Sequence, residues 1–298
     1  MLAVHQLEKT YAGNVAALRG ISLDIPPGMF GLLGPNGAGK TTFMRILAGL
    51  LEPSAGRVLF DGDDIVAHPD RLWPRLGYLP QYFGFYPNLT GTAMLRHMLR
   101  LKGVAHPRGL EVLCAELLER VNLSDAAGRA VKGYSGGMRQ RLGIAQAIAG
   151  DPALLIVDEP TAGLDPEERT RFYRLLAELA ETRTVLLSTH IVEDVAMLCP
   201  RFAVLCAGEL RTNSTPGAAT SALQGHIFEG EVAREHFDAV SDGYRVTRAY
   251  LVEGRNRMRI HAPDGRVPEG FTPAAPTLED AYLLLTMDVR VTTAAGGG

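Results

Sequence analysis

The sequence is poor in cysteine and lysine. It contains 3 cysteines among 298 residues, and none of them belongs to a Cys-x-x-Cys pair. Neither a disulfide framework nor a zinc site is therefore expected. The lysines are Lys9, Lys40, Lys102 and Lys132, whereas arginine is abundant. A lysine inside a glycine-rich loop is notable against this background.

The sequence also lacks long apolar runs, a signal peptide and an excess of positive charge. No stretch is long and apolar enough to predict a transmembrane helix. The N-terminal residues lack the basic start and apolar stretch of a secretory signal. The formal net charge is −3, which gives no electrostatic footprint for nucleic acid. These features predict a soluble intracellular protein that binds no nucleic acid.

Apolar runs alternate with helical patterns along the first two thirds of the chain. Met29 to Leu33, Ala153 to Val157 and Thr184 to Ser188 are typical of buried strands. Pro166 to Glu181 has a helical pattern, and the segment from about 88 to 150 is mainly helical. This alternation predicts an α/β fold with a parallel sheet and an inserted helical subdomain.

The composition changes near residue 212. Thr212 to Gln224 is uncharged and rich in small residues, which favours a linker. Tyr244 to His261 is typical of two strands joined at Glu253-Gly254. We therefore expect a first domain over 1–211 and a small α+β C-terminal domain over 212–298. Small residues from Thr292 onward predict a flexible tail.

A phosphate-binding loop is the strongest local motif. The pattern Gly-x-x-x-x-Gly-Lys-Thr follows a strand and opens a helix, which is the context that this motif requires. Glycines allow successive backbone amides to surround phosphates, and the N-terminus of the helix favours the same anions. Lys40 is expected to reach the β- and γ-phosphates of a bound nucleotide, and Thr41 to offer its hydroxyl to Mg²⁺. The loop comprises Gly34, Pro35, Asn36, Gly37, Ala38, Gly39, Lys40 and Thr41, and Thr42 follows it.

Two carboxylates end the strand that begins near Ala153. Asp158 would lie at the edge of the sheet beside the phosphate loop, where it could hold Mg²⁺. Glu159 points the other way from the pleat, which suits a base that polarises the attacking water. Acidic turns after strands are common, so this pair alone would be weak evidence for a catalytic site. Together with the phosphate loop, the pair becomes strong evidence.

The segment Tyr134-Ser135-Gly136-Gly137-Met138-Arg139-Gln140-Arg141-Leu142 resembles the ABC transporter signature, whose usual form is Leu-Ser-Gly-Gly-Gln. It lies before Asp158, in the order that this family shows. Further segments are similar to other family motifs: Gln81 to the Q-loop, Gly163-Leu164-Asp165-Pro166 to the D-loop, and Ser188-Thr189-His190 to the H-loop. Tyr11, before Ala16-Ala17-Leu18, resembles the aromatic residue that stacks on adenine. The resemblance covers residues 1 to about 211. It departs from the usual signature at Tyr134 and Met138.

The resemblance implies a P-loop ABC ATPase core that works as a dimer, with ATP held between two subunits. Its catalytic residues would be Lys40, Gln81, Glu159 and His190, and its metal ligands Thr41, Gln81 and Asp158. Tyr11, the loop from Gly34 to Thr42, and Asp165 would bind nucleotide. Ser135, Gly136 and Gly137 would do so from the other subunit.

Simpler structural roles stay open for several of these residues. Tyr11 could be a core-packing tyrosine. Asp165 could only cap the helix that begins at Pro166. Gln81 and His190, each taken alone, could be ordinary loop residues.

The resemblance further implies a separate integral-membrane permease as partner, a peripheral place on the cytoplasmic face of the membrane, and a dimer that we expect to contain two copies of this chain. The aromatic residues Tyr82, Phe83, Phe85 and Tyr86 follow Gln81, where the family meets its membrane partner. Such a cluster suits a protein interface, but packing against the helical subdomain would explain it equally well.

The C-terminal segment from Pro276 to Thr286 looks like the closing segment of ATPases that serve drug and antibiotic exporters. It could also be no more than a helix capped by Thr277 and Asp280. We therefore expect export of drug-like or amphipathic compounds. Import, lipid or polysaccharide export and cofactor maturation remain open. A second class, the soluble ABC ATPases that act on nucleic acid or ribosomes, is less compatible with one cassette and a slightly negative charge.

Overall fold

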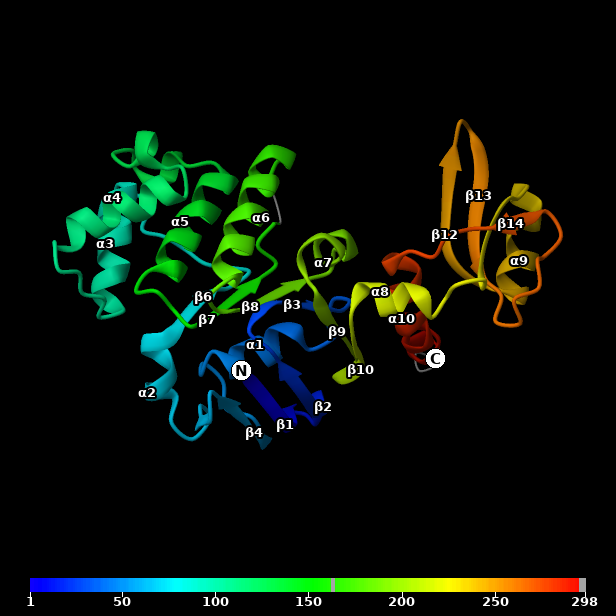
Figure 1. The fold of residues 1–298 in the computed structure, drawn as a ribbon, viewed down its shortest axis with the longest axis horizontal. Helices are drawn as coiled ribbons and strands as arrows, with labels where there is room; N and C mark the ends of the chain where they lie inside the picture. Colours follow the sequence, from blue (N-terminus) through cyan, green and yellow to red (C-terminus); the bar gives the residue numbers. More distant parts are fainter. Residues whose placement is uncertain (162–163, 295–298) are drawn as a thin grey trace.

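The computed structural model describes residues 1–161 and 164–294, with side chains described up to Met287 (Figure 1). Within these ranges the strands form three sheets. The first is antiparallel, in the order β2-β1-β4-β5: β1 (Leu2–Tyr11), β2 (Val15–Ile25), β4 (Ala55–Phe60) and β5 (Asp63–Asp64). The central sheet is parallel except for β10, in the order β10-β9-β3-β8-β7-β6: β3 (Gly28–Leu33), β6 (Leu76–Leu79), β7 (Leu154–Asp158), β8 (Thr184–Thr189), β9 (Arg201–Cys206) and β10 (Glu209–Ser214). The third is antiparallel, in the order β12-β13-β11-β14: β11 (Ile227–Glu231), β12 (Arg245–Val252), β13 (Arg255–His261) and β14 (Phe271–Pro273).

The helices α3, α4 and α5 gather at one end of the molecule, and the third sheet with α9 forms the other end (Figure 1). The α-helices are α1 (Lys40–Leu47), α2 (Pro69–Leu72), α3 (Gly91–Leu101), α4 (Leu110–Arg120), α5 (Gly136–Ile148), α6 (Pro166–Ala180), α7 (Val192–Leu198), α8 (Pro216–Ser221), α9 (Phe237–Gly243) and α10 (Leu278–Ala294). Short 3₁₀ turns are η1 (Trp73–Arg75), η2 (Ser124–Ala126), η3 (Val131–Gly133) and η4 (Arg234–His236). In the described ranges no helix combines the length and apolarity needed to cross a bilayer.

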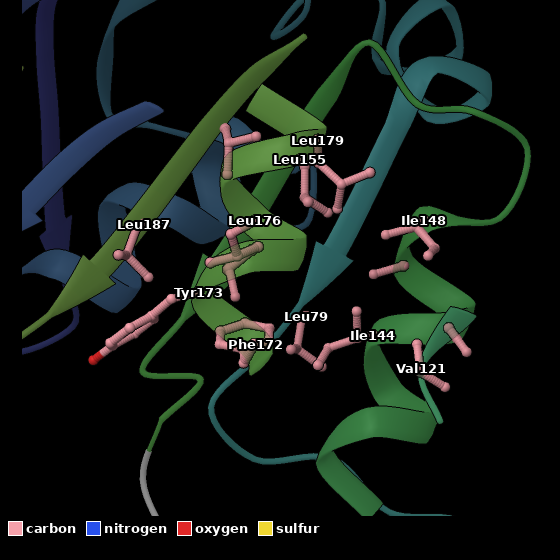
Figure 2. Packing of buried hydrophobic residues seen from close by; sticks show 14 of the residues in the cluster. Leu79, Val121, Ile144, Ile148, Leu155, Phe172, Tyr173, Leu176, Leu179 and Leu187 are labelled. Carbon is pink, nitrogen blue, oxygen red and sulfur yellow. The ribbon is translucent and has the colours of Figure 1, made fainter. Parts of the chain in front are cut away.

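The central sheet is covered on both faces, as the continuous apolar strands predict. Every residue of β7 and β8 is buried. Leu155 and Leu187 point toward α6, where they meet Leu176 (Figure 2). Residues of the same strands that alternate with these, such as Leu154, pack with α1 on the opposite face. The predicted α/β core with a parallel sheet is therefore confirmed.

The register of the central sheet brings three strand ends together. Leu33 of β3 pairs with Thr189 of β8, and Asp158 of β7 pairs with Ser188. The residues that follow these strands therefore leave the same edge of the sheet. This edge is where the phosphate loop, the acidic pair and His190 begin.

The segment from Thr212 to Gln224 is not the linker that its composition predicted. Thr212, Asn213 and Ser214 pair with β9 as the last residues of β10. Thr215 then caps α8 by accepting a hydrogen bond from the amide of Ala218 (3.1 Å). Small polar residues suit both an edge strand and a helix cap, so their composition did not distinguish these roles from a flexible connection.

The last helix returns to the first part of the chain. Leu278 and Tyr282 of α10 join the apolar cluster that contains Val195 of α7 and Phe202 of β9. The expected C-terminal domain therefore has two parts. Helix α10 packs against α7 and β9 of the first part of the chain. Strands β11 to β14 and helix α9 share a separate small core. The helix runs to Ala294 and so includes part of the expected tail. Residues 295–298 lie outside the described residues.

The two local predictions for the C-terminal part are confirmed. Strands β12 and β13 flank Glu253-Gly254, and both turn residues have positive φ (50° and 79°), as a tight hairpin turn requires. Thr277 and Asp280 form the capping box of α10. The amide of Thr277 donates to Oδ2 of Asp280 (2.8 Å), and the amide of Asp280 donates to the hydroxyl of Thr277 (3.2 Å).

Asp280 also ties α10 to the third sheet. It lies 2.8 Å from Nη2 of Arg259 on β13 and accepts a hydrogen bond from Thr247 on β12 (2.6 Å). Burial alone would raise the pKa of Asp280, but the hydrogen bonds from Arg259, Thr247 and Thr277 outweigh it and lower this pKa below its usual value. The ionised form therefore stabilises the packing of the two units.

We predict that Asp280→Ala lowers the free energy of unfolding by about 2 kcal/mol, because it removes one of the two carboxylates that pair with the largely buried guanidinium of Arg259, the other being Glu229. The pKa of Asp280 is lower in the folded state, so its contribution is present above the ordinary aspartate pKa and is lost as the pH falls through the folded-state pKa. Unfolding curves at pH 7 and at stepwise lower pH should show the difference from wild type shrinking on acidification.

The matched control is Glu231→Ala, which removes an exposed pair with Arg255 (3.4 Å) on the same sheet. This change should cost less than about 1 kcal/mol. Equal losses for the two variants would contradict the role given to Asp280.

Candidate nucleotide-binding site

The phosphate loop connects β3 to α1. Its last glycine, Gly39, has φ 103° and immediately precedes the helix. A Cβ at this position would lie 2.5 Å from the carbonyl oxygen of Ala17, so both the conformation and the space require glycine. The amides at the start of α1 consequently face outward from the edge of the sheet, where they could bind phosphate.

Lys40 is the buried cation of this loop, with 6% of its surface exposed. Its Nζ donates hydrogen bonds to the carbonyl oxygens of Gly34 (2.7 Å) and Pro35 (3.3 Å). It also lies 3.6 Å from Oε1 of Glu159. Burial lowers the pKa of Lys40, and the nearby Glu159 and Asp158 carboxylates partly oppose that effect. The ammonium group is held within the curve of the loop.

Asp158 and Thr41 form a pair suited to a hard cation. The Thr41 hydroxyl donates to Oδ2 of Asp158 (3.2 Å). Oδ1 of Asp158 is buried and has no hydrogen-bond partner among the described residues. Burial raises the pKa of this carboxyl group, so a cation beside it would favour the ionised form. An acceptor of this kind next to a hydroxyl fits Mg²⁺, which prefers oxygen ligands and would neutralise phosphate charge here.

Glu159 lies between two of the predicted site residues. It adopts φ 49°, while its amide donates to the carbonyl oxygen of Ser188 (2.9 Å). Positive φ is uncommon for a side chain of this kind and is typical of functional turns. Its Oε2 accepts a hydrogen bond from Nδ1 of His190 (2.5 Å), while its Oε1 faces Lys40. One carboxylate thus contacts both Lys40 and His190, two of the residues that the resemblance assigns to catalysis.

A pocket of about 270 Å³ lies over the phosphate loop. Gln81, which follows β6, and Glu159 contribute to its walls from outside the loop. Its lining comprises Ala17, Pro35, Asn36, Gly37, Ala38, Gly39, Lys40, Thr41, Thr42, Gln81 and Glu159. The structure therefore brings Gln81 together with the residues that sequence analysis assigned to ATP.

Tyr11 lies at the rim of this arrangement. Its hydroxyl shares a hydrogen bond with the hydroxyl of Thr42 (3.2 Å), and its side chain is exposed. The alternative of core packing for Tyr11 is therefore wrong, and stacking of its ring on adenine stays a prediction. Sequence analysis missed Lys9, whose Nζ lies 5.5 Å from the centre of this ring. Lys9 and Tyr11 lie two residues apart on β1, a spacing that places side chains on the same face of a strand and could have indicated their contact.

The signature segment does not contribute to this pocket. Ser135 caps α5 by accepting a hydrogen bond from the amide of Met138 (3.1 Å), and none of the described lining residues comes from Ser135, Gly136 or Gly137. At the other edge of this motif, Tyr134 replaces the usual leucine as a buried residue whose hydroxyl donates to the carbonyl oxygen of Ala126 (2.7 Å). Tyr134 therefore packs within the helical end, while Ser135 and Gly136 at the start of α5 are exposed.

Asp165 has the capping role that its sequence context predicted. It accepts a hydrogen bond from the amide of Glu168 (2.8 Å) at the start of α6. The resemblance of this segment to a D-loop includes Gly163, which lies outside the described residues. A nucleotide-binding role for Asp165 stays a prediction.

A family model described as ABC transporter matches residues 18–162. The daunorubicin/doxorubicin resistance ATP-binding protein DrrA of Streptomyces peucetius is 40% identical over 223 residues, which cover 74% of this chain and 67% of that protein. The uncharacterized ABC transporter ATP-binding protein YxlF of Bacillus subtilis is 40% identical over 299 residues, covering 95% and 98%. Among solved structures, the dimeric post-hydrolysis state of the ATP-binding cassette MJ0796 with ADP and Pi has a TM-score of 0.66 and 27% identity, covering 72% of this chain and 98% of that one.

We predict that Lys40→Ala weakens ATP binding by about 10- to 100-fold, because a charge-assisted hydrogen bond to phosphate contributes about 1.5–3 kcal/mol. Titration with a fluorescent ATP analogue measures this change directly. Arg57→Ala, which removes an exposed cation from β4, is the control and should leave affinity unaltered. Unchanged affinity in the Lys40 variant would overturn the assignment of the loop.

Proposed function

The chain belongs to the ABC transporter family of ATP-binding proteins, and we propose that it hydrolyses ATP as one half of a dimer that drives a separate membrane-embedded permease. ATP hydrolysis is the activity of this family, and one cassette of known structure was captured with ADP and Pi. The observation that carries the proposal for this chain is the pairing of Glu159 with Lys40 and His190 at the mouth of the phosphate pocket.

Glu159 is the proposed base for the attacking water. Its carboxylate emerges from β7 directly after Asp158, so the base and the Mg²⁺ ligand share one strand end. Phosphate binding would draw Lys40 and His190 away from Glu159, because both groups are hydrogen-bond donors that favour anionic oxygens. The carboxylate would then be released to accept a proton from water, while His190 stabilises the charge that develops as the bond breaks.

Gln81, Thr41 and Asp158 are the proposed holders of Mg²⁺. Gln81 contributes its side chain from the segment after β6, across the pocket from the loop. Mg²⁺ would supply charge neutralisation on the phosphates. The amide of Gln81 and the Thr41 hydroxyl are neutral ligands, so Asp158 contributes the negative charge of this set.

The second half of the site is proposed to come from another copy of the chain. Ser135 caps α5, a helix of 13 residues, and Gly136 and Gly137 form the start of its first turn. Gly137 is buried against Glu168 of α6, whereas Ser135 and Gly136 are exposed and do not line the pocket of their own chain. Their exposure would allow them to contact a γ-phosphate held by a partner. Two copies related by a twofold axis would complete two such sites at once.

The proposed binding site for the permease is a groove of about 570 Å³. It is bounded by Trp73 of η1, by Tyr78 of β6 and by Leu101 of α3, and both Trp73 and Leu101 are exposed. The segment that leaves β6 carries two further exposed aromatic residues outside the groove lining, Tyr82 and Tyr86, which are 85% and 61% exposed. An exposed set with several aromatic members beside a polar rim is typical of protein interfaces. A permease seated here would place the chain at the cytoplasmic face of the membrane.

The aromatic cluster after Gln81 thus has two separate parts. Phe83 and Phe85 pack edge to face, 5.2 Å apart, against the core that supports the helical end. Tyr82 and Tyr86 point outward. Sequence analysis left interface and packing as alternatives for the whole cluster. Packing describes Phe83 and Phe85, whereas the exposure of Tyr82 and Tyr86 supports the proposal of an interface.

Export of drug-like or amphipathic compounds is the proposed direction and substrate class. A relative with 40% identity is named for resistance to daunorubicin and doxorubicin, which fits an exporter. The capping box at Thr277 belongs to the C-terminal segment that suggested this group, although such a cap is not specific to it. Action on nucleic acid or ribosomes is not favoured by any of these observations.

We predict that Glu159→Gln abolishes turnover while preserving ATP binding. Loss of the base should lower kcat by about 10²- to 10⁴-fold, and ATP should then accumulate between two chains as a stable dimer. Phosphate release measures the first effect, and light scattering after size exclusion with ATP measures the second. Glu193→Gln, an exposed change close to His190 in sequence, is the control. Wild-type turnover in Glu159→Gln would refute its role as base.

We also predict that Tyr82→Ala combined with Tyr86→Ala removes binding to the permease without affecting ATP binding. Each side chain is exposed, so truncation leaves the core intact, whereas a central interface tyrosine can contribute about 2 kcal/mol or more. The tagged chain should recover one polytopic protein from detergent-solubilised membranes, and the double variant should not.

Leu251→Ala is the matched control, because Leu251 is comparably exposed (68%) at the hairpin of the third sheet. Retained recovery with the tyrosine variant and loss with the leucine variant would move the docking surface to the C-terminal part. Recovery of ribosomal material in place of a membrane protein would instead favour the soluble class of ABC ATPases.

A further inference from the structure

Asp194 is a completely buried carboxylate that lies outside the proposed catalytic set. It belongs to the first turn of α7, close to His190 in sequence, and 0% of its surface is exposed. A buried carboxylate is costly unless hydrogen bonds and a counter-charge surround it. This side chain has both kinds of partner, and its partners come from three different segments of the site.

Two threonine hydroxyls donate to Oδ2 of Asp194. Thr161 donates at 3.1 Å and lies two residues after Glu159. Thr189 donates at 3.2 Å and lies directly before His190. A single carboxylate oxygen therefore links the turn that carries the proposed base to the strand end that carries the proposed γ-phosphate ligand.

The other oxygen of Asp194 is held by α6. Both Tyr173 and Arg169 donate hydrogen bonds to Oδ1, and Arg169 also donates to the Tyr173 hydroxyl. Figure 2 shows Tyr173 on α6 next to Leu187 of β8, with its hydroxyl directed away from the apolar cluster. This helix is the one that begins at Asp165.

We propose that Asp194 is a positioning residue for ATP hydrolysis, which fixes Glu159 and His190 relative to each other through Thr161 and Thr189 and ties both to α6. The proposal rests on the roles given above to Glu159 and His190. Their 2.5 Å hydrogen bond depends on the relative placement of two chain segments that leave neighbouring strands. Asp194 is bonded to both segments within two residues of each side chain, so it constrains that placement directly.

The geometry predicts an effect on the chemical step rather than on ATP binding. None of the residues bonded to Asp194 lines the phosphate pocket, so the loop amides that would bind phosphate do not depend on Asp194 for their placement. A displacement of the base by a fraction of an ångström is sufficient to slow a reaction that depends on alignment. Loss of the carboxylate should therefore lower kcat at an unchanged KM for ATP.

The first test compares Asp194→Asn with Asp280→Asn in the full chain. Both substitutions replace a buried aspartate that pairs with an arginine and accepts from threonine hydroxyls, but Asp280 lies between α10 and the third sheet, away from the nucleotide site. We expect Asp194→Asn to lower kcat at least about tenfold with KM within about twofold, and Asp280→Asn to leave both unchanged below its unfolding transition. Equal kcat in the two variants would overturn the proposal.

The second test uses Thr161, whose hydroxyl donates to Asp194 alone among the bonds described for it. Thr161→Val should lower kcat, and Thr161→Ser, which keeps the hydroxyl, should restore it. In the double variant with Asp194→Asn, the two effects should be less than multiplicative, because both remove one interaction. A fully multiplicative double variant, or an inactive Thr161→Ser variant, would contradict the proposed link.

His190→Ala and Glu159→Gln separate failure of this proposal from failure of the site. If both are inactive while Asp194→Asn and Thr161→Val hydrolyse ATP like wild type, the site holds and the role of Asp194 is refuted. If His190→Ala and Glu159→Gln are themselves fully active, the proposed base and its partner are wrong, and the positioning role falls with them.

Discussion

The parallel register of β3, β8 and β7 is the constraint on which the nucleotide site depends. These strands are fully or almost fully buried, so their pairing is secured by apolar contacts on both faces of the sheet. Pairing of Leu33 with Thr189 and of Asp158 with Ser188 fixes where each chain segment leaves the sheet. A shift of one residue in any of these strands would turn its side chains to the opposite face and separate the phosphate loop from its acidic partner.

Electrostatics at that edge follow from burial. Lys40, Asp158 and Glu159 are each less than 9% exposed, so their charges interact with little screening by solvent. Glu159 balances Lys40 on one oxygen and engages His190 on the other. A nucleotide phosphate would compete for both donors. The contacts of Glu159 with Lys40 and His190 hold these three side chains together. In the proposed mechanism, phosphate would replace both contacts and release the Glu159 carboxylate.

Most of the fold and most of the candidate site could be predicted from short stretches of sequence. The phosphate loop, the strand that ends at Asp158 and the cap at Asp165 depend on neighbouring residues, and each lies where the sequence predicted it. Contacts between segments far apart in the sequence could not be predicted in this way. The composition of Thr212 to Ser214 predicted a linker, because nothing within this segment indicates that it pairs with β9. The return of α10 to α7 and β9 was hidden for the same reason. Exposure was hidden too, since only the structure separates Tyr82 from Phe83.

The helix α6 joins parts of the site that sequence motifs treat as independent. Glu168 on α6 forms an ion pair with Arg141 on the signature helix (2.7 Å). Its neighbour Arg169 reaches in another direction, to Asp194. Because Ser135 caps α5 and Asp194 is bonded to the segments of Glu159 and His190, one turn of α6 connects the signature segment to the segments that carry the proposed base and its partner. A movement of α5 when a second copy approaches would be passed to α6 through the Arg141 pair, and packed helices transmit such shifts as rigid bodies. In the proposed dimer, a partner's signature segment would complete the pocket, because this segment contributes no residue to the described lining of the pocket in its own chain. The contacts of α6 would then link the two sites in which one chain takes part.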